Sequence, residues 1–133
     1  KLEDECVATE DGLRKTMFGA NPMAEAVIGY SGDQAVGFAL FFHTFSTFLG
    51  APSLYLEDLF VLPEWRGKGL GRQLLSYLAG LAADRGCQRL EWAVLDWNEP
   101  SIGFYKGLGA VPQDEWTTYR LSGEALEKLG GEA

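Results

Sequence analysis

Apolar residues in the first half of the chain follow the short, alternating runs that are typical of β-strands. The strands predicted in this way are Met23–Tyr30, Val36–Phe45 and Leu54–Leu62. Turn-forming or strand-breaking residues separate and end them: Ser31-Gly32-Asp33, Gly50-Ala51-Pro52-Ser53 and Pro63. The first two strands therefore form a hairpin, and a third strand follows it.

Helical spacing dominates the second half. A long helix is predicted by Leu70, Leu74, Leu75, Leu78, Leu81 and Ala82, with its end at Arg85 and Gly86. Shorter helices are predicted over Thr9–Phe18 (capped by Thr9 and ended by Gly19), Pro100–Leu108 and Glu124–Leu129. Two further strands are predicted over Arg89–Leu95 and Trp116–Leu121. Strands that come first and then alternate with helices indicate a mixed α/β sheet rather than a purely parallel one.

Six residues between the third strand and the long helix, Arg66-Gly67-Lys68-Gly69-Leu70-Gly71, form the most informative motif. Its three alternating glycines let a bulky anion approach the backbone N–H groups, because glycine has no Cβ atom. The helix that begins here adds unpaired N–H donors and the positive end of its dipole. Arg66, Lys68 and Arg72 add a positive cluster to a chain whose formal net charge is −8. The motif therefore predicts a phosphate site.

Three classes of phosphate compound compete for this loop. A P-loop for nucleotides needs a lysine followed by serine or threonine, whereas Lys68 is followed by Gly69. A dinucleotide fold needs the order G-x-G-x-x-G in a tight strand–helix turn, with an acidic residue about 20 positions later. Glu91 has that spacing, but the glycines alternate and residues 63–66 intervene after the strand. The third class is an acyl-CoA.

Composition narrows the partners. The 133 residues, 47% of them hydrophobic, are one domain's length. The negative charge disfavours duplex nucleic acid as a partner. No apolar run reaches the roughly 20 residues of a membrane helix, and residues 1–5 do not resemble a signal peptide, so a cytoplasmic location fits. Cys6 and Cys87 lack metal-ligand spacing and His43 is the only histidine, so we expect no metal.

Two carboxylates, Glu57 and Asp58, interrupt the apolar third strand. Adjacent residues of a regular strand point to opposite faces, so only one would reach a given cleft, but a β-bulge would bring both near it. An exposed charged pair at a strand edge is the alternative. Tyr105 follows Asn98 on a short helix, where it is either a half-buried aromatic or a proton donor, and Asn98 is either a ligand or a simple helix cap.

The glycine loop and two further blocks together resemble the GNAT superfamily of N-acetyltransferases. Residues 54–61 (Leu-Tyr-Leu-Glu-Asp-Leu-Phe-Val) look like its central strand, and residues 97–106 (Trp-Asn-Glu-Pro-Ser-Ile-Gly-Phe-Tyr-Lys) look like its second cofactor helix. Both blocks are most similar to the spermidine/spermine (diamine) acetyltransferase family. The resemblance implies a single α/β domain of the α+β type over residues 1–133. Its mixed, mostly antiparallel central sheet would be flanked by helices, without the opening strand and helix that the family has before the position of Lys1.

The resemblance also implies acetyl-CoA as the acetyl donor. The residues it assigns to binding this cofactor are Leu59, Phe60, Val61, Arg66, Gly67, Lys68, Gly69, Leu70, Gly71, Arg72, Asn98, Ser101, Tyr105 and Lys106. Two of the residues would be catalytic. Glu57 would accept the proton of the amine, directly or through water, and Tyr105 would protonate the departing thiolate.

By the same resemblance, the acceptor would be a primary amine of a small polycationic substrate, a diamine or polyamine. The residues expected to bind it are Glu57, Asp58, Glu91, Trp92 and Asp114. However, residues 45–48 carry no acidic side chain where the diamine enzymes tend to have one. A lysine-like amino acid such as thialysine, or a protein amine, is the alternative acceptor. A non-catalytic CoA-binding module is the alternative of a different class, and the family also makes a homodimer plausible.

Overall fold

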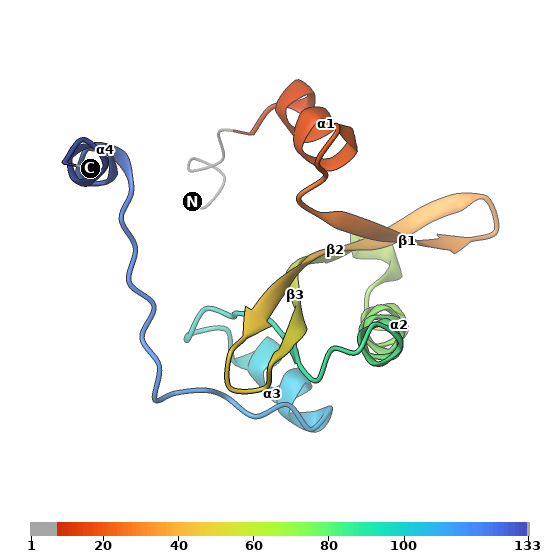
Figure 1. The fold of residues 1–133 in the computed structure, drawn as a ribbon. Coiled ribbons are helices and arrows are strands. Elements are labelled where there is room, and N and C mark those ends of the chain that lie inside the picture. Colours follow the sequence, from red (N-terminus) through yellow and green to blue (C-terminus); the bar gives the residue numbers. More distant parts are fainter. Residues whose placement is uncertain (1–7, 133) are drawn as a thin grey trace. The chain divides into compact units, whose positions relative to one another are not determined.

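The computed structural model describes residues 8–132 (Figure 1). The helices are α1 (Glu10–Phe18), α2 (Leu70–Asp84), α3 (Glu99–Gly107) and α4 (Gly123–Gly130), with a 3-10 turn, η2, at Pro63–Trp65. The strands are β1 (Glu25–Ser31), β2 (Gln34–Ser46), β3 (Ala51–Val61) and β4 (Leu90–Glu91). Contacts divide the chain into two compact units, Lys1–Ala93, which holds the sheet and α2, and Val94–Ala133, which holds α3 and α4.

The four strands form one sheet in the order β1-β2-β3-β4. β1 pairs with β2 and β2 with β3 in antiparallel fashion, whereas β3 and β4 are parallel, which confirms the mixed, mostly antiparallel sheet. The core of the first unit lies where α2 packs against the strands. The buried apolar side chains are Val36, Ala39, Phe41, Leu54, Leu56, Leu74, Leu75, Leu78, Ala82 and Cys87. The leucines of the predicted long helix thus supply its buried face.

A β-bulge interrupts β3 at the two carboxylates. Leu40 of β2 pairs with Asp58, but the next residue, Phe41, pairs with Leu56, so Glu57 is an extra residue on β3. The sequence analysis left open whether the strand is regular or bulged here, and the structure has the bulge. Glu57 and Asp58 therefore both stand opposite Leu40, and both are exposed.

The predicted break at residues 50–53 is wrong in its position. The turn ends at Gly50, whose N–H donates to the carbonyl of Ser46 at 2.8 Å, and β3 already begins at Ala51. Pro52 fits inside the strand for a geometric reason. Leu54 donates its N–H to Arg89, on the side away from β2, and the nitrogen of Pro52, two residues earlier, lies on that same side. Proline therefore removes no hydrogen bond from the β2–β3 ladder.

Two strands predicted in the second half also need correction. Only Leu90 and Glu91 of the expected Arg89–Leu95 strand pair with a neighbour, and Trp116–Leu121 forms no strand. Trp116 and Tyr119 favour extended backbone, but a strand also needs a partner for its backbone groups, and within the second unit the described residues offer no second strand.

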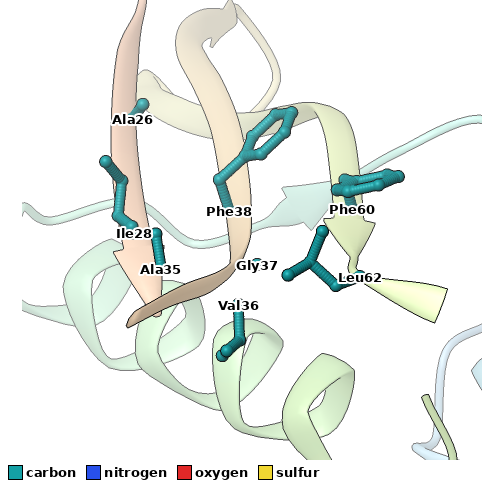
Figure 2. A pocket seen from close by; sticks show the side chains of 8 residues that line it. All are labelled: Ala26, Ile28, Ala35, Val36, Gly37, Phe38, Phe60 and Leu62. Carbon is teal, nitrogen blue, oxygen red and sulfur yellow. The ribbon is translucent and has the colours of Figure 1, made fainter. Parts of the chain in front are cut away.

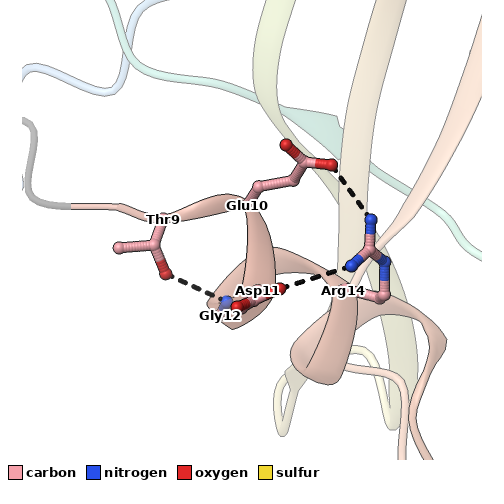
Figure 3. Close-up of polar contacts among 5 residues, drawn as sticks. All are labelled: Thr9, Glu10, Asp11, Gly12 and Arg14. Atoms are coloured by element: carbon pink, nitrogen blue, oxygen red, sulfur yellow. Dashed lines mark hydrogen bonds and ion pairs between the residues drawn. The ribbon is translucent and has the colours of Figure 1, made fainter.

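Helix α1 begins as the sequence predicts. The hydroxyl of Thr9 accepts a hydrogen bond from the N–H of Gly12 at 3.0 Å, and the guanidinium of Arg14 contacts Glu10 and Asp11 one turn earlier (Figure 3). Gly19 ends the helix, with its N–H donating to Lys15. These contacts are local and exposed, so α1 contributes no residue to the buried core.

Candidate functional site

The glycine loop leaves the first turn of α2 without a side-chain cap. Gly69 is the N-cap residue, so no side chain accepts from the backbone N–H groups of the first turn, formed by residues 70–72. Gly67 and Gly69 have φ angles of 77° and 84°, and beyond their chain neighbours no atom lies within 4 Å of the place where a Cβ would stand. Backbone donors with open space beside them are what a phosphate group requires.

Arg66 and Lys68, two of the expected phosphate ligands, already make contacts within the protein. The Nε atom of Arg66 donates to the carbonyl oxygen of Val61 at 2.9 Å, and its guanidinium carbon lies 5.7 Å from the centre of the Phe60 ring. The ammonium of Lys68 lies 5.6 Å from the centre of the Trp65 ring. The hydrogen bond of Arg66 ties the end of β3 to the start of the loop, so Arg66 helps to position the loop.

Next to the loop, β3 presents an open backbone edge. Its parallel ladder with β4 comprises two residue pairs and ends where Tyr55 meets Glu91. From there to Val61, the edge of β3 that faces away from β2 has no strand partner among the described residues. β3 and β4 therefore separate just before the bulge, and backbone groups are available between them.

The alternation of the strand decides which residues use that edge. Leu62 donates its N–H to Val36 of β2, and backbone groups point to alternate sides along a strand. Leu59 and Val61 consequently direct their N–H and C=O groups to the open edge, where the carbonyl of Val61 also accepts the hydrogen bond from Arg66, whereas the groups of Phe60 point toward β2. An extended ligand can pair with Leu59 and Val61 as an added strand would.

Acidic side chains gather at the other end of this edge. Tyr55 and Glu91 are partners in the parallel ladder and so point to the same face of the sheet. Burial, followed by the negative charges of Glu57 and Glu91, raises the pKa of the Tyr55 hydroxyl above its ordinary value of 10.0. Glu57 and Asp58 are exposed, and Trp92, which directly follows Glu91, is half-buried. Glu57 and Glu91 thus lie close enough to Tyr55 for their charges to act on its hydroxyl.

The sequence analysis did not single out Tyr55 as a candidate site residue. It lies within the block that resembles the central strand of the superfamily, two positions before Glu57. The only signal for it in the sequence was an aromatic residue close to a carboxylate pair. An aromatic residue within a strand pattern normally indicates packing.

In the second unit, α3 carries most of the remaining expected site residues. The side chain of Asn98 accepts a hydrogen bond from the N–H of Ser101 at 3.4 Å and caps the helix. Tyr105 is half-buried, and this burial raises the pKa of its hydroxyl above 10.0, so the hydroxyl keeps its proton at neutral pH. Lys106 in the last turn and Asp114 beyond the helix are both exposed.

A shallow apolar hollow of about 270 Å³ lies over β1, β2 and the end of β3 (Figure 2). Its lining residues are Ala26, Ile28, Ala35, Val36, Gly37, Phe38, Phe60 and Leu62. None of these side chains titrates, so the hollow offers no group for proton transfer. Among residues 8–132, no group of three or more His, Cys, Asp or Glu residues could hold a metal ion, and no helix there is long and apolar enough to cross a membrane.

Comparisons with known proteins agree with this arrangement. A model of the acetyltransferase (GNAT) family matches residues 3–110. The thialysine N-epsilon-acetyltransferase of Sus scrofa is 37% identical over 142 residues, which cover 98% of this chain and 83% of the relative. The spermidine/spermine N(1)-acetyltransferase-like protein 1 of Homo sapiens is 31% identical over 134 residues, 93% of this chain and 19% of the relative. The solved structure of an integron cassette protein from the mobile metagenome of V. cholerae matches with a TM-score of 0.81 and 32% identity, over 95% of this chain and 80% of that one.

Proposed function

The chain belongs to the acetyltransferase (GNAT) family, and from this premise we propose that it transfers the acetyl group of acetyl-CoA to the side-chain amine of a lysine-like amino acid of the thialysine type. The observation that carries the choice of acceptor is the similarity to a thialysine enzyme, which extends over 98% of this chain and 83% of that relative. The similarity to the spermidine/spermine-like protein covers 19% of that protein's length. The comparison therefore favours the acceptor that the sequence analysis held as the alternative.

The first unit fits the donor at two places. The uncapped first turn of α2 and the open loop at Gly67 and Gly69 would hold the pyrophosphate. The open edge of β3 at Leu59 and Val61 would pair with the pantetheine arm, and an N–H group there would also polarise the acetyl carbonyl. When bound, acetyl-CoA supplies an acetyl group activated as a thioester.

An ammonium acceptor loses two protons during the transfer: one to become the neutral amine that attacks, and one after its nitrogen has bonded to the acetyl carbon. The sulfur of CoA gains one proton when the carbon–sulfur bond breaks, so one proton is released overall and the protein needs both a proton acceptor and a proton donor. An alkylammonium with a pKa of about 10.4 lies about three units from its neutral form at pH 7, a cost of about 4 kcal/mol. Glu57, the extra residue of the bulge, would accept this proton, directly or through water. Tyr105 would donate the proton that the sulfur gains, and its raised pKa suits an acid that must stay protonated until the carbon–sulfur bond breaks.

A polycationic amine is the second candidate acceptor. It is favoured by the carboxylates of Glu57, Asp58 and Glu91 on neighbouring strands and by the formal net charge of −8. Both candidates share one property, because a lysine-like amino acid and a diamine each carry a second ammonium group several bonds from the reacting nitrogen.

Thiol release from acetyl-CoA tests the proposal. The acceptor panel contains thialysine, lysine, ornithine, 1,5-diaminopentane, spermidine and a lysine peptide. We expect the highest kcat/KM with thialysine. A higher value with spermidine would move the assignment to polyamines, whereas the absence of thiol release with every amine, at concentrations where CoA binds, would leave a non-catalytic CoA-binding module.

A further inference from the structure

We infer that Tyr55 is a substrate-positioning residue whose ring, together with the carboxylate of Glu91, holds the second ammonium group of the acceptor. In a lysine-like amino acid this group is the α-ammonium. The inference rests on the proposed acetyl transfer and adds to it a residue that discriminates between acceptors.

Two observations fix the position of the Tyr55 ring. The ladder between β3 and β4 ends at the pair Tyr55–Glu91, so the residue stands where the two strands separate. Its centroid lies 5.2 Å from that of Phe42, its partner on β2, with an angle of 35° between the rings. Contact with Phe42 on one side and pairing with Glu91 on the other hold the ring at the inner end of the open edge.

The proposed proton acceptor lies next to Tyr55 on the same strand. Tyr55 and Glu57 are two residues apart and share a face of the strand, whereas in a regular strand Asp58 would point to the opposite face. The inserted residue instead places both Glu57 and Asp58 opposite Leu40. Tyr55 is therefore within electrostatic reach of carboxylates from both strands, Glu57 on its own strand and Glu91 on β4.

A buried hydroxyl lies two residues before Tyr55 on the same strand face. Only 1% of the surface of Ser53 is exposed, and its Oγ atom has no hydrogen-bond partner among the described residues. Buried polar atoms almost always have a partner, and a water molecule is the ordinary partner of such a hydroxyl.

The groups around Tyr55, at the inner end of the open edge, favour the binding of an ammonium group. The face of a tyrosine ring attracts a cation, and the attraction increases when a site is shielded from water. Glu91 supplies negative charge, while the Tyr55 hydroxyl keeps its proton at neutral pH and adds no second charge. An uncharged group at the same place would gain none of these interactions.

The test compares two acceptors that differ only in the second ammonium, thialysine and 3-(2-aminoethylthio)propanoate, which is thialysine without its α-amino group. We expect wild-type KM to be about tenfold lower for thialysine. Tyr55→Leu should reduce this ratio to within about twofold, chiefly by raising the KM of thialysine, while the Kd of CoA stays unchanged. Tyr55→Phe keeps the ring and should retain most of the preference. Tyr77→Leu, at an exposed position on α2, is the matched control and should change neither acceptor's KM.

Glu91→Gln provides a second route if Tyr55→Leu does not fold, because it removes one charge with little change of shape. It should raise the KM of thialysine and leave that of the analogue nearly unchanged. Suppose that the wild-type enzyme transfers the acetyl group and that Tyr55→Leu leaves the ratio of the two KM values unchanged. This result, or the same result in Glu91→Gln where Tyr55→Leu is unfolded, would overturn the inference and leave the proposed function standing. Absence of transfer by the wild-type enzyme to every amine would overturn the proposed function itself.

Discussion

Tyr105 is the single residue on which the proposed chemistry depends most. Its hydroxyl is half-buried and keeps its proton because burial raises its pKa above 10.0. A general acid of this kind contributes typically 10²–10⁴-fold to a rate. Tyr105→Phe removes the proton donor but keeps the ring, so we expect kcat to fall by about 10²-fold or more while the Kd of CoA is unchanged. Tyr119→Phe, in the same unit and 93% exposed, is the control.

The raised pKa also gives Tyr105 a pH signature. The protonated hydroxyl is the active form, so activity that depends on it is retained up to the ordinary tyrosine value of 10.0 and is lost only above that value. We expect the alkaline limb of wild-type kcat to lie above pH 10.0 and to disappear in Tyr105→Phe. A limb that persists in the variant would assign the titration to another group.

At the scale of elements, the sequence predicts most of the arrangement where a local pattern and its partner lie close together in the chain. The hairpin, the long helix and the capped α1 follow from spacing and turn residues, whereas two carboxylates in an apolar strand left a regular strand and a bulge both open. Trp116–Leu121 shows the limit, since strand propensity is a local property, whereas a strand also needs a partner, and the described residues of its unit provide none. The proposed role of Tyr55 could not be predicted for a similar reason, because only the parallel ladder between β3 and β4 brings Glu91 next to it.

The loop between η2 and α2 carries the prediction for donor binding. Gly69 has a φ angle of 84°, which L side chains adopt at a cost of about 1–2 kcal/mol. Gly69→Ala should therefore tilt the first N–H groups of α2 and raise the KM of acetyl-CoA severalfold, with little effect on the KM of the acceptor. Gly80→Ala, in the middle of α2 with nothing within 4 Å of the added methyl, should leave both values unchanged and stabilise the helix slightly. Equal effects of the two variants would remove the loop from donor binding.

At the scale of the whole first unit, one ion pair joins elements that are distant in the sequence. Arg85, at the end of α2, donates two hydrogen bonds to the carboxylate of Glu25 on β1, at 2.8 and 2.9 Å. Both side chains are partly exposed, so the pair is expected to contribute about 0.5–1 kcal/mol. The hydrogen bond from Arg85 lowers the pKa of Glu25 below 4.5, so this contribution is present above that pH and is lost as the pH falls through the lowered value.

Urea unfolding of Glu25→Gln checks this contribution. At pH 7 the variant should be less stable than the wild type by about 0.5–1 kcal/mol, and the difference should vanish well below pH 4.5. Glu10→Gln, which breaks a fully local pair on α1, should leave the free energy of unfolding nearly unchanged at both pH values. A difference for Glu25→Gln that persists in acid would mean that packing of the side chain, and not the ion pair, stabilises the unit.

The bulge at Glu57 also has a consequence for solubility. An exposed strand edge with unpaired backbone groups is a template on which other chains can aggregate, and proteins counter this with bulges and charges. Here the separation of β3 from β4 creates such an edge, and the bulge breaks its regular hydrogen-bonding pattern while Glu57 and Asp58 place two negative charges on it. The residues that make this edge suitable for an extended ligand thus also make it a poor template for another strand. A chain with Glu57 deleted would gain a regular edge along with a loss of charge, and self-association would be its expected defect.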